Sequence, residues 1–187
     1  MKTPLILLSL LVVILGAIFL FNKKPVTVPI ISDYKNAEYI IDGLKIKLTN
    51  GVFEGAISGS ASKVVARYFG NEVRHDLNDD GREDVVFLMT FNTGGTGTFF
   101  YVVAALNTVN GYVGSQGLLL GDRIAPQTTE MSQNPRHVNV IVVNYADRKP
   151  GEPMVTEPSV GKSIWIKLDP KIMQFGEVVQ NFEGESR

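Results

Sequence analysis

The apolar residues beyond residue 36 occur in short runs with a two-residue period, and this pattern constrains the fold most strongly. Leu44, Ile46 and Leu48 alternate with Lys45 and Lys47, as in a strand with one buried face. Similar runs, rich in Val, Ile, Phe, Tyr and Thr, recur at short intervals and are separated by Gly, Asn, Asp and Pro. The pattern predicts one all-β or predominantly β domain, either a sandwich or an open barrel.

Individual strands are predicted from the same runs. Asn50-Gly51 lies between two of them and is typical of a β-hairpin with a type I′ turn. The segments 85–89 and 138–143 are almost continuously apolar, which predicts central strands covered on both faces. Including the strands that contain these two runs, the predicted strands cover residues 64–69, 72–77, 84–91, 98–106, 112–120, 138–145 and 163–168.

Residues 5–21 form an uncharged apolar run near the N-terminus. As a helix this run spans about 26 Å, near the lower limit for a bilayer core. A cleaved signal peptide has a shorter apolar core, of about 7 to 15 residues, and a small-x-small cleavage site. No such site follows this run, so an uncleaved signal-anchor is favoured over a cleaved signal peptide. A buried core helix is disfavoured because the run has no polar face.

Charge and cysteine content exclude several classes of protein. The chain has 18 basic and 19 acidic residues, so it lacks the basic excess typical of nucleic-acid binders. Three of the basic residues precede residue 25, so 15 basic and 19 acidic residues follow and carry a formal charge of −4. The absence of cysteine excludes disulfides, a cysteine nucleophile, thiolate zinc sites and a lipid-modified cysteine.

Three regions follow from these observations. We expect a transmembrane signal-anchor over residues 1–24, a spacer over 25–36 and an extracytoplasmic β domain over 37–187. Lysines flank the apolar run on both sides, so the positive-inside rule barely discriminates between orientations. The very short segment before the run is typical of a signal-anchor. We therefore expect a single-pass protein of the cytoplasmic membrane with its C-terminal domain outside the cytoplasm.

One segment, 76–84, has the pattern D-x-N-x-D-G-x-x-D, in which oxygen-bearing side chains occupy alternate positions. Calcium prefers six to eight oxygen ligands, and short loops supply them at this spacing, with a glycine at the sharp turn. Position seven contributes a backbone carbonyl. The predicted calcium ligands are Asp76, Asn78, Asp80, Asp84 and the carbonyl of Arg82.

A metal-free turn is the alternative for this segment. Asn-Asp-Asp-Gly is favourable turn chemistry by itself, because Asx side chains bond nearby backbone amides and glycine accepts positive φ. Four carboxylates within nine residues repel one another unless something neutralises them, which favours a cation. The loop is not an EF-hand, because Phe87 stands where the bidentate glutamate belongs and the flanking residues are typical of strands.

The loop resembles the strand–loop–strand calcium loops of FG-GAP (integrin-type) repeats and the start of a dockerin loop. This resemblance covers about nine residues and implies calcium ligation by the residues named above. Those families carry several copies, whereas this chain has one, so neither a propeller nor a cohesin-binding role follows. More broadly, GSASKVVARYFG, GYVGSQGLLLGDRIAPQTTE and VIVVNYADRKPGEP, within residues 55–168, resemble an uncharacterised bacterial extracytoplasmic domain, sometimes found with META-type β domains. That resemblance implies an envelope protein and supplies no catalytic residues.

No motif for catalysis is complete. Gly161-Lys162-Ser163 lacks the first glycine of a P-loop, because Thr156 occupies that position, and no G-x-S-x-G is present. We therefore expect a non-enzymatic binding or structural module of the bacterial envelope, calcium-stabilised, with an unknown protein or envelope ligand as partner. The alternative is a calcium-assisted hydrolase of envelope polymers with paired carboxylates. Asp76 and Asp84 are unavailable for that role if they bind metal, and Glu54, Glu72 and Glu130 have no motif around them. An inhibitor of hydrolases has no sequence support of its own.

Overall fold

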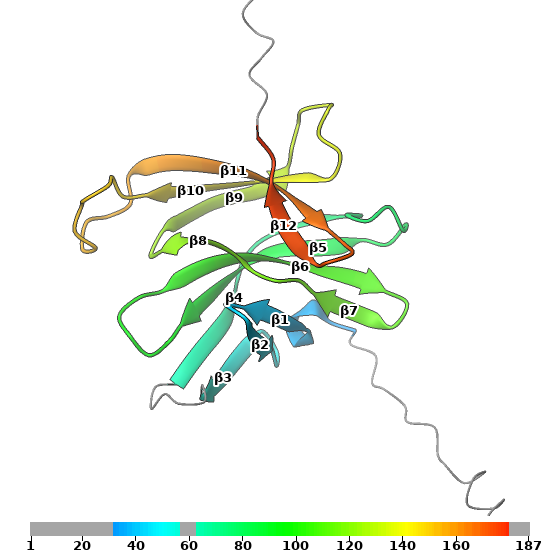
Figure 1. Cartoon of the computed structure of the whole chain (residues 1–187), viewed down its shortest axis with the longest axis horizontal. Helices are drawn as coiled ribbons and strands as arrows, with labels where there is room; N and C mark the ends of the chain where they lie inside the picture. The colour runs from blue at the N-terminus through cyan, green and yellow to red at the C-terminus, as the bar shows by residue number, and fades with distance from the viewer. Residues whose placement is uncertain (1–31, 57–62, 180–187) are drawn as a thin grey trace, which may run out of the picture.

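The structure, a computed structural model, describes residues 32–56 and 63–179 and is built from three antiparallel β-sheets (Figure 1). This confirms the predicted predominantly β fold. The predicted signal-anchor and most of the predicted spacer lie outside the described residues. Within those residues, no helix is long and apolar enough to cross a membrane.

A six-stranded sheet forms the middle layer. Its strands are ordered β3-β4-β5-β6-β7, and β8 pairs with β6 beyond the end of β7. Strand β5 carries the apolar run for which a central position was predicted, and it pairs with a neighbour on each side, which confirms that prediction. The strands are β3 (Val52–Ala56), β4 (Lys63–His75), β5 (Asp84–Asn92), β6 (Phe99–Thr108), β7 (Gly111–Gly114) and β8 (Leu118–Asp122).

Two smaller sheets lie on opposite sides of the middle one (Figure 1). The four-stranded sheet is ordered β12-β11-β10-β9, and the two-stranded sheet pairs β1 with β2 after a short 3₁₀ helix, η1. Their elements are η1 (Tyr34–Asn36), β1 (Glu38–Ile41), β2 (Leu44–Lys47), β9 (Ala125–Met131), β10 (Val140–Asp147), β11 (Val160–Asp169) and β12 (Gln174–Glu177).

The two faces of the middle sheet bury two separate hydrophobic clusters. On β5, Phe87 faces the cluster formed with η1, β1 and β2, which includes Tyr39. Its neighbour Leu88 faces the opposite cluster, which includes Ile141 of β10 and Ile166 of β11. Successive side chains of a strand point to opposite faces, so one uninterrupted apolar strand serves both clusters.

The predicted hairpin at Asn50-Gly51 is wrong, although the turn itself has the expected backbone. Both residues have positive φ, 50° and 80°, as a type I′ turn requires. The turn closes only an isolated bridge, because β2 pairs with β1 whereas β3 pairs with β4. Asp42-Gly43, with φ of 49° and 77°, instead makes the β1–β2 hairpin.

Other strand boundaries also differ from the predictions. Segment 64–69 and residues 72–75 of the predicted strand 72–77 belong to the single strand β4, whose pairing with β5 shifts register on both sides of Gly70. Gly70 and Asn71 have φ of 112° and 49°, so a glycine-asparagine pair typical of a turn forms a bulge here. The predicted strand 112–120 is two strands, β7 and β8, that pair with different parts of β6.

Candidate functional site

The predicted calcium loop connects β4 to β5 and folds around the carboxylate of Asp76. Asp76 Oδ1 accepts the backbone N–H of Asp80 at 3.1 Å, and Oδ2 accepts that of Gly81 at 2.7 Å. Asn78 Oδ1 also accepts the Asp80 N–H, at 3.2 Å. These are the Asx-type bonds that both a calcium loop and a metal-free turn require, and they hold the first, third and fifth loop positions together.

Asp80 is paired with Arg82 inside the loop. The Arg82 guanidinium donates to Asp80 Oδ2 at 2.6 Å, and the Arg82 backbone N–H donates to Oδ1 at 2.9 Å. Desolvation opposes the charge of Asp80, but these bonds, one from Asn78 and the positive charge outweigh it and lower its pKa. The same guanidinium donates to the backbone carbonyl of Asn107 at 2.7 Å. Arg82 therefore neutralises one of the loop acids in the described structure.

Asp84, the last predicted ligand, is fully buried at the start of β5. Its two oxygens accept backbone N–H groups of Leu77, at 2.9 Å, and of Asn107, at 2.7 Å. Burial raises the pKa of Asp84, the two hydrogen bonds lower it, and the nearby charges of Asp80 and Asp76 raise it, so that the net direction is upward. Both oxygens already anchor the loop to the backbone.

The loop also joins elements from both of the larger sheets. Asn139, immediately before β10, donates to the carbonyl of Leu77 at 3.2 Å and to Asp79 Oδ1 at 3.3 Å. Its side-chain oxygen lies 3.2 Å from Nε2 of His75, at the end of β4. On the other side, Asn107 near the β6–β7 turn binds Asp84 and Arg82. The loop is therefore the joint between the middle sheet and the four-stranded sheet at this end.

The predicted ligands are oxygen atoms, which calcium prefers, but several of them already accept hydrogen bonds from the protein. All predicted ligands present oxygen, and a carboxylate has about four acceptor sites, of which Asp76 uses two on backbone amides. Within residues 32–56 and 63–179, no three His, Cys, Asp or Glu side chains are placed as a ready metal cluster. An ion would have to share Asp76 with the loop amides and replace the Arg82 guanidinium on Asp80.

The acids named for the alternative hydrolase lie on three different strands and are each paired. Glu54 of β3 forms an ion pair with Arg67 at 3.1 Å. Glu72, in the bulged part of β4, accepts hydrogen bonds from two tyrosine hydroxyls and from an arginine. Glu130 of β9 accepts a hydrogen bond from Asn144 at 3.3 Å. Each of these carboxylates therefore has a partner other than a second carboxylate.

A serine–histidine contact follows β9, and the sequence motifs had not indicated it. Ser132 Oγ lies 2.7 Å from Nδ1 of His137. The same hydroxyl accepts the backbone N–H of Asn134, and the His137 N–H donates to the Asn134 carbonyl. The contact is therefore part of the turn that leads from β9 toward β10.

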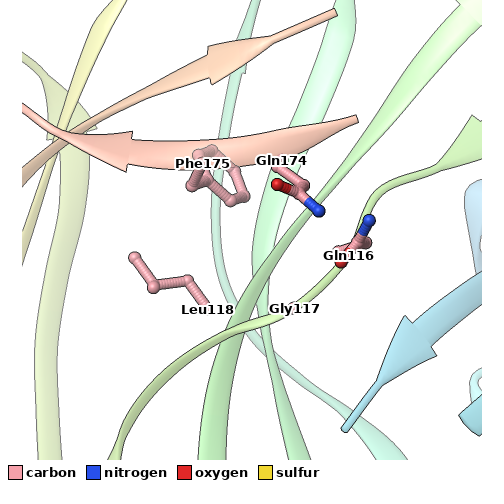
Figure 2. A pocket seen from close by; sticks show the side chains of 5 residues that line it. All are labelled: Gln116, Gly117, Leu118, Gln174 and Phe175. Carbon is pink, nitrogen blue, oxygen red and sulfur yellow. The ribbon is translucent and has the colours of Figure 1, made fainter. Parts of the chain in front are cut away.

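Small cavities also lie elsewhere on the part of the chain that the structure describes, and sequence reasoning missed them. One, of about 300 Å³, lies on β4, β5 and Thr98, which immediately precedes β6; Arg67 lines it but is paired with Glu54. Another, of about 210 Å³, lies between β12 and the connection from β7 to β8 (Figure 2). It is lined by Gln116, Gly117, Leu118, Gln174 and Phe175. Glutamines this far apart in the chain form no motif.

The chain was compared with protein-family models, with curated proteins and with solved structures. None of the three comparisons finds a match.

Proposed function

We propose that this chain is a non-enzymatic binding or structural module of the bacterial envelope. In this proposal, residues 5–21 anchor it in the cytoplasmic membrane and the β domain, a layered sandwich, lies outside the cytoplasm. The observation that carries the proposal is the position of the acidic loop 76–84, which joins the two larger sheets through Asn139 and Asn107. A loop in that position can set the rigidity of the whole domain.

Calcium is the proposed occupant of the loop, with Asp76, Asn78, Asp80, Asp84 and the Arg82 carbonyl as its ligands. The cation would supply positive charge to a segment in which burial, and then the charges of Asp80 and Asp76, raise the pKa of Asp84. Arg82 supplies part of that charge in the described structure, so its guanidinium competes with the ion for Asp80. Free calcium outside the cytoplasm reaches the millimolar range in which extracellular modules bind it.

Thermal unfolding of the full chain in detergent tests the calcium proposal. We expect EDTA to lower Tm and calcium to restore it, because an ion that binds only the folded state stabilises it. At calcium concentrations about ten to a hundred times Kd, the gain is about 1.4 to 2.7 kcal/mol. Magnesium should have a weaker effect because its octahedral shell is less adaptable.

Two loop variants separate a bound ion from general charge effects. Asp80→Ala removes a proposed ligand oxygen and should abolish the calcium response. Asp79→Asn changes the same charge in the same loop at a position outside the ligand set, and its left-handed φ of 60° tolerates asparagine. It should keep the response. Equal Tm values with and without calcium in the unmodified chain would exclude the metal.

The proposed location has its own test. Protease added to intact spheroplasts expressing the full chain should degrade the β domain without lysis, while a cytoplasmic marker protein remains intact. Protection of the β domain until the membrane is disrupted would show the opposite orientation.

A further inference from the structure

The segment Ser115–Gly117, between β7 and β8, is the place where all three sheets are hydrogen-bonded together. Its Gly117 N–H donates to the carbonyl of Ile40 in β1 at 2.8 Å, and the Ile40 N–H donates to Ser115. The Gln116 N–H points to the other side and donates to the carbonyl of Met173, just before β12, at 2.8 Å. The cavity of about 210 Å³ opens at this junction.

The walls of this cavity are held in place by buried contacts. Ser115 is fully buried, and its hydroxyl accepts the N–H of Ala104 at 2.8 Å and donates to the Gln116 carbonyl at 2.9 Å. Gly117 allows the close approach of β1, since a Cβ there would lie 2.5 Å from Cδ1 of Ile41. The backbone beneath the cavity is therefore preorganised, which lowers the entropic cost of binding.

The lining is mostly polar, with two amides beside a small apolar patch. Figure 2 shows the amides of Gln116 and Gln174 on one side, and Leu118 and Phe175 on the other. Within the described part of the chain, neither glutamine side chain has a hydrogen-bond partner. Phe175 and Leu118 are partly buried against the second hydrophobic cluster, so their positions are fixed by packing.

We propose that this cavity binds a single uncharged saccharide ring. Each glutamine amide offers donors and an acceptor, which match neighbouring hydroxyls or an acetamido group. A C–H edge of the ring would touch the small exposed part of Phe175. None of the five lining residues is charged, which favours a neutral ligand. The volume lies below the range of about 300 to 1,000 Å³ typical of larger ligands, so it suits one ring rather than an extended peptide.

The inference rests on the proposed binding function and specifies its ligand, and NMR tests it directly. The full chain, labelled with ¹⁵N and held in a detergent without a sugar headgroup, is titrated with N-acetylglucosamine. We expect the side-chain amide resonances of Gln116 and Gln174 and the backbone resonance of Gly117 to shift together. A small and open site of this kind should give a Kd on the order of 1 to 10 mM.

Substitutions assign the binding to this cavity. Gln174→Ala, at an exposed position, and the double change with Gln116→Ala should weaken binding at least about tenfold in Kd, the effect of losing directed hydrogen bonds. Gln127→Ala, an exposed glutamine on β9, is the matched control and should leave Kd unchanged.

Three outcomes would overturn the saccharide site. They are no shift at the cavity with N-acetylglucosamine, equal shifts in the Gln174→Ala variant, and shifts with the uncharged peptide probe N-acetylalanine methylamide but not with the sugar. Calcium-dependent stability together with any of these would leave the proposed envelope module standing and remove its sugar ligand. Sugar binding without any calcium response would support the saccharide site and exclude calcium from the loop.

Discussion

Asp84 and Ser115, a charged and a polar residue, are both fully buried in the described part of the molecule. Both side chains bind backbone amides of neighbouring elements: Asp84 binds Leu77 and Asn107, and Ser115 binds Ala104. A buried acceptor without such a donor costs about 1 to 3 kcal/mol, so these bonds make the two burials tolerable. They also explain why two loops of irregular backbone have defined positions.

Thr129 on β9 lacks that compensation. Its hydroxyl oxygen is buried and has no hydrogen-bond partner within the residues that the structure describes. We expect Thr129→Val, which keeps the β-branched shape and removes the hydroxyl, to raise the free energy of unfolding by about 1 kcal/mol. Urea unfolding of the full chain measures this. Thr128→Val, which removes the acceptor of the Asn144 amide, is the control and should not stabilise the protein. A loss of stability in Thr129→Val would show that the hydroxyl is bonded.

Glu72 should make stability depend on pH. Burial opposes its charge, but hydrogen bonds from Tyr34, Tyr68 and Arg74, together with the arginine charge, outweigh burial and lower its pKa. A carboxyl whose pKa is lower in the folded state stabilises the fold above its unfolded pKa, and this contribution is lost as the pH falls through the folded pKa.

Glu72→Gln should therefore be less stable than the unmodified chain near neutral pH, and the difference should shrink as the pH falls through the folded pKa of Glu72, which lies below the ordinary value for a glutamate. Urea midpoints at several pH values measure this difference. A gap that stays constant over the whole range would mean that the side chain acts through shape rather than charge.

At the scale of elements, local patterns predicted where strands lie better than they predicted which strands pair. The apolar run of β5 was enough to place it centrally because no other position covers both faces of a strand. Strand β9, with the residues APQTTEM, was missed because its mostly polar residues and its proline give little strand signal. Which of two identical turn types makes a hairpin depends on long-range pairing, as the Asn50-Gly51 and Asp42-Gly43 turns show.

In the two candidate sites, too, local features were predictable from the sequence and contacts between distant segments were not. The spacing of Asp76, Asn78 and Asp80 placed their side chains on one turn, since an Asx loop is a local structure. The bond of Arg82 to Asn107 and the burial of Asp84 depend on the β6–β7 turn and were not predictable. The cavity at the three-sheet junction was equally hidden, because it forms only when β12 lies beside the β7–β8 connection.

Two glycines within strands differ in how closely their neighbours pack against them. In β7, a Cβ on Gly114 would lie against the Glu38 carbonyl oxygen and within 2.6 Å of the Tyr39 ring. In β11, a Cβ on Gly161 would have no heavy atom within 4 Å. We expect Gly114→Ala to destabilise the protein by about 1 to 3 kcal/mol, the usual cost of overpacking, and Gly161→Ala to be almost neutral. Thermal unfolding of the pair measures this, and equal effects would contradict the close approach of β1 to β7.

At the scale of the whole molecule, the middle sheet makes the two hydrophobic clusters interdependent. Strands β5 and β6 contribute alternate side chains to both clusters, so neither smaller sheet has a complete core without them. The acidic loop and the segment Ser115–Gly117 add hydrogen bonds between sheets at separate places. We therefore expect the β domain to unfold as one cooperative unit.

Phe87→Ala tests this cooperativity, because Phe87 belongs to one cluster and the reporter lies on the other side of the middle sheet. The ring packs against Tyr34, Tyr39 and Tyr68, so its loss should cost about 3 to 5 kcal/mol. Trp165, the chain's single tryptophan, lies on β11 of the four-stranded sheet. In urea, its fluorescence midpoint should fall together with that of far-ultraviolet circular dichroism. A tryptophan transition that stays in place while the dichroism signal moves would mean that the four-stranded sheet keeps its structure without the first cluster.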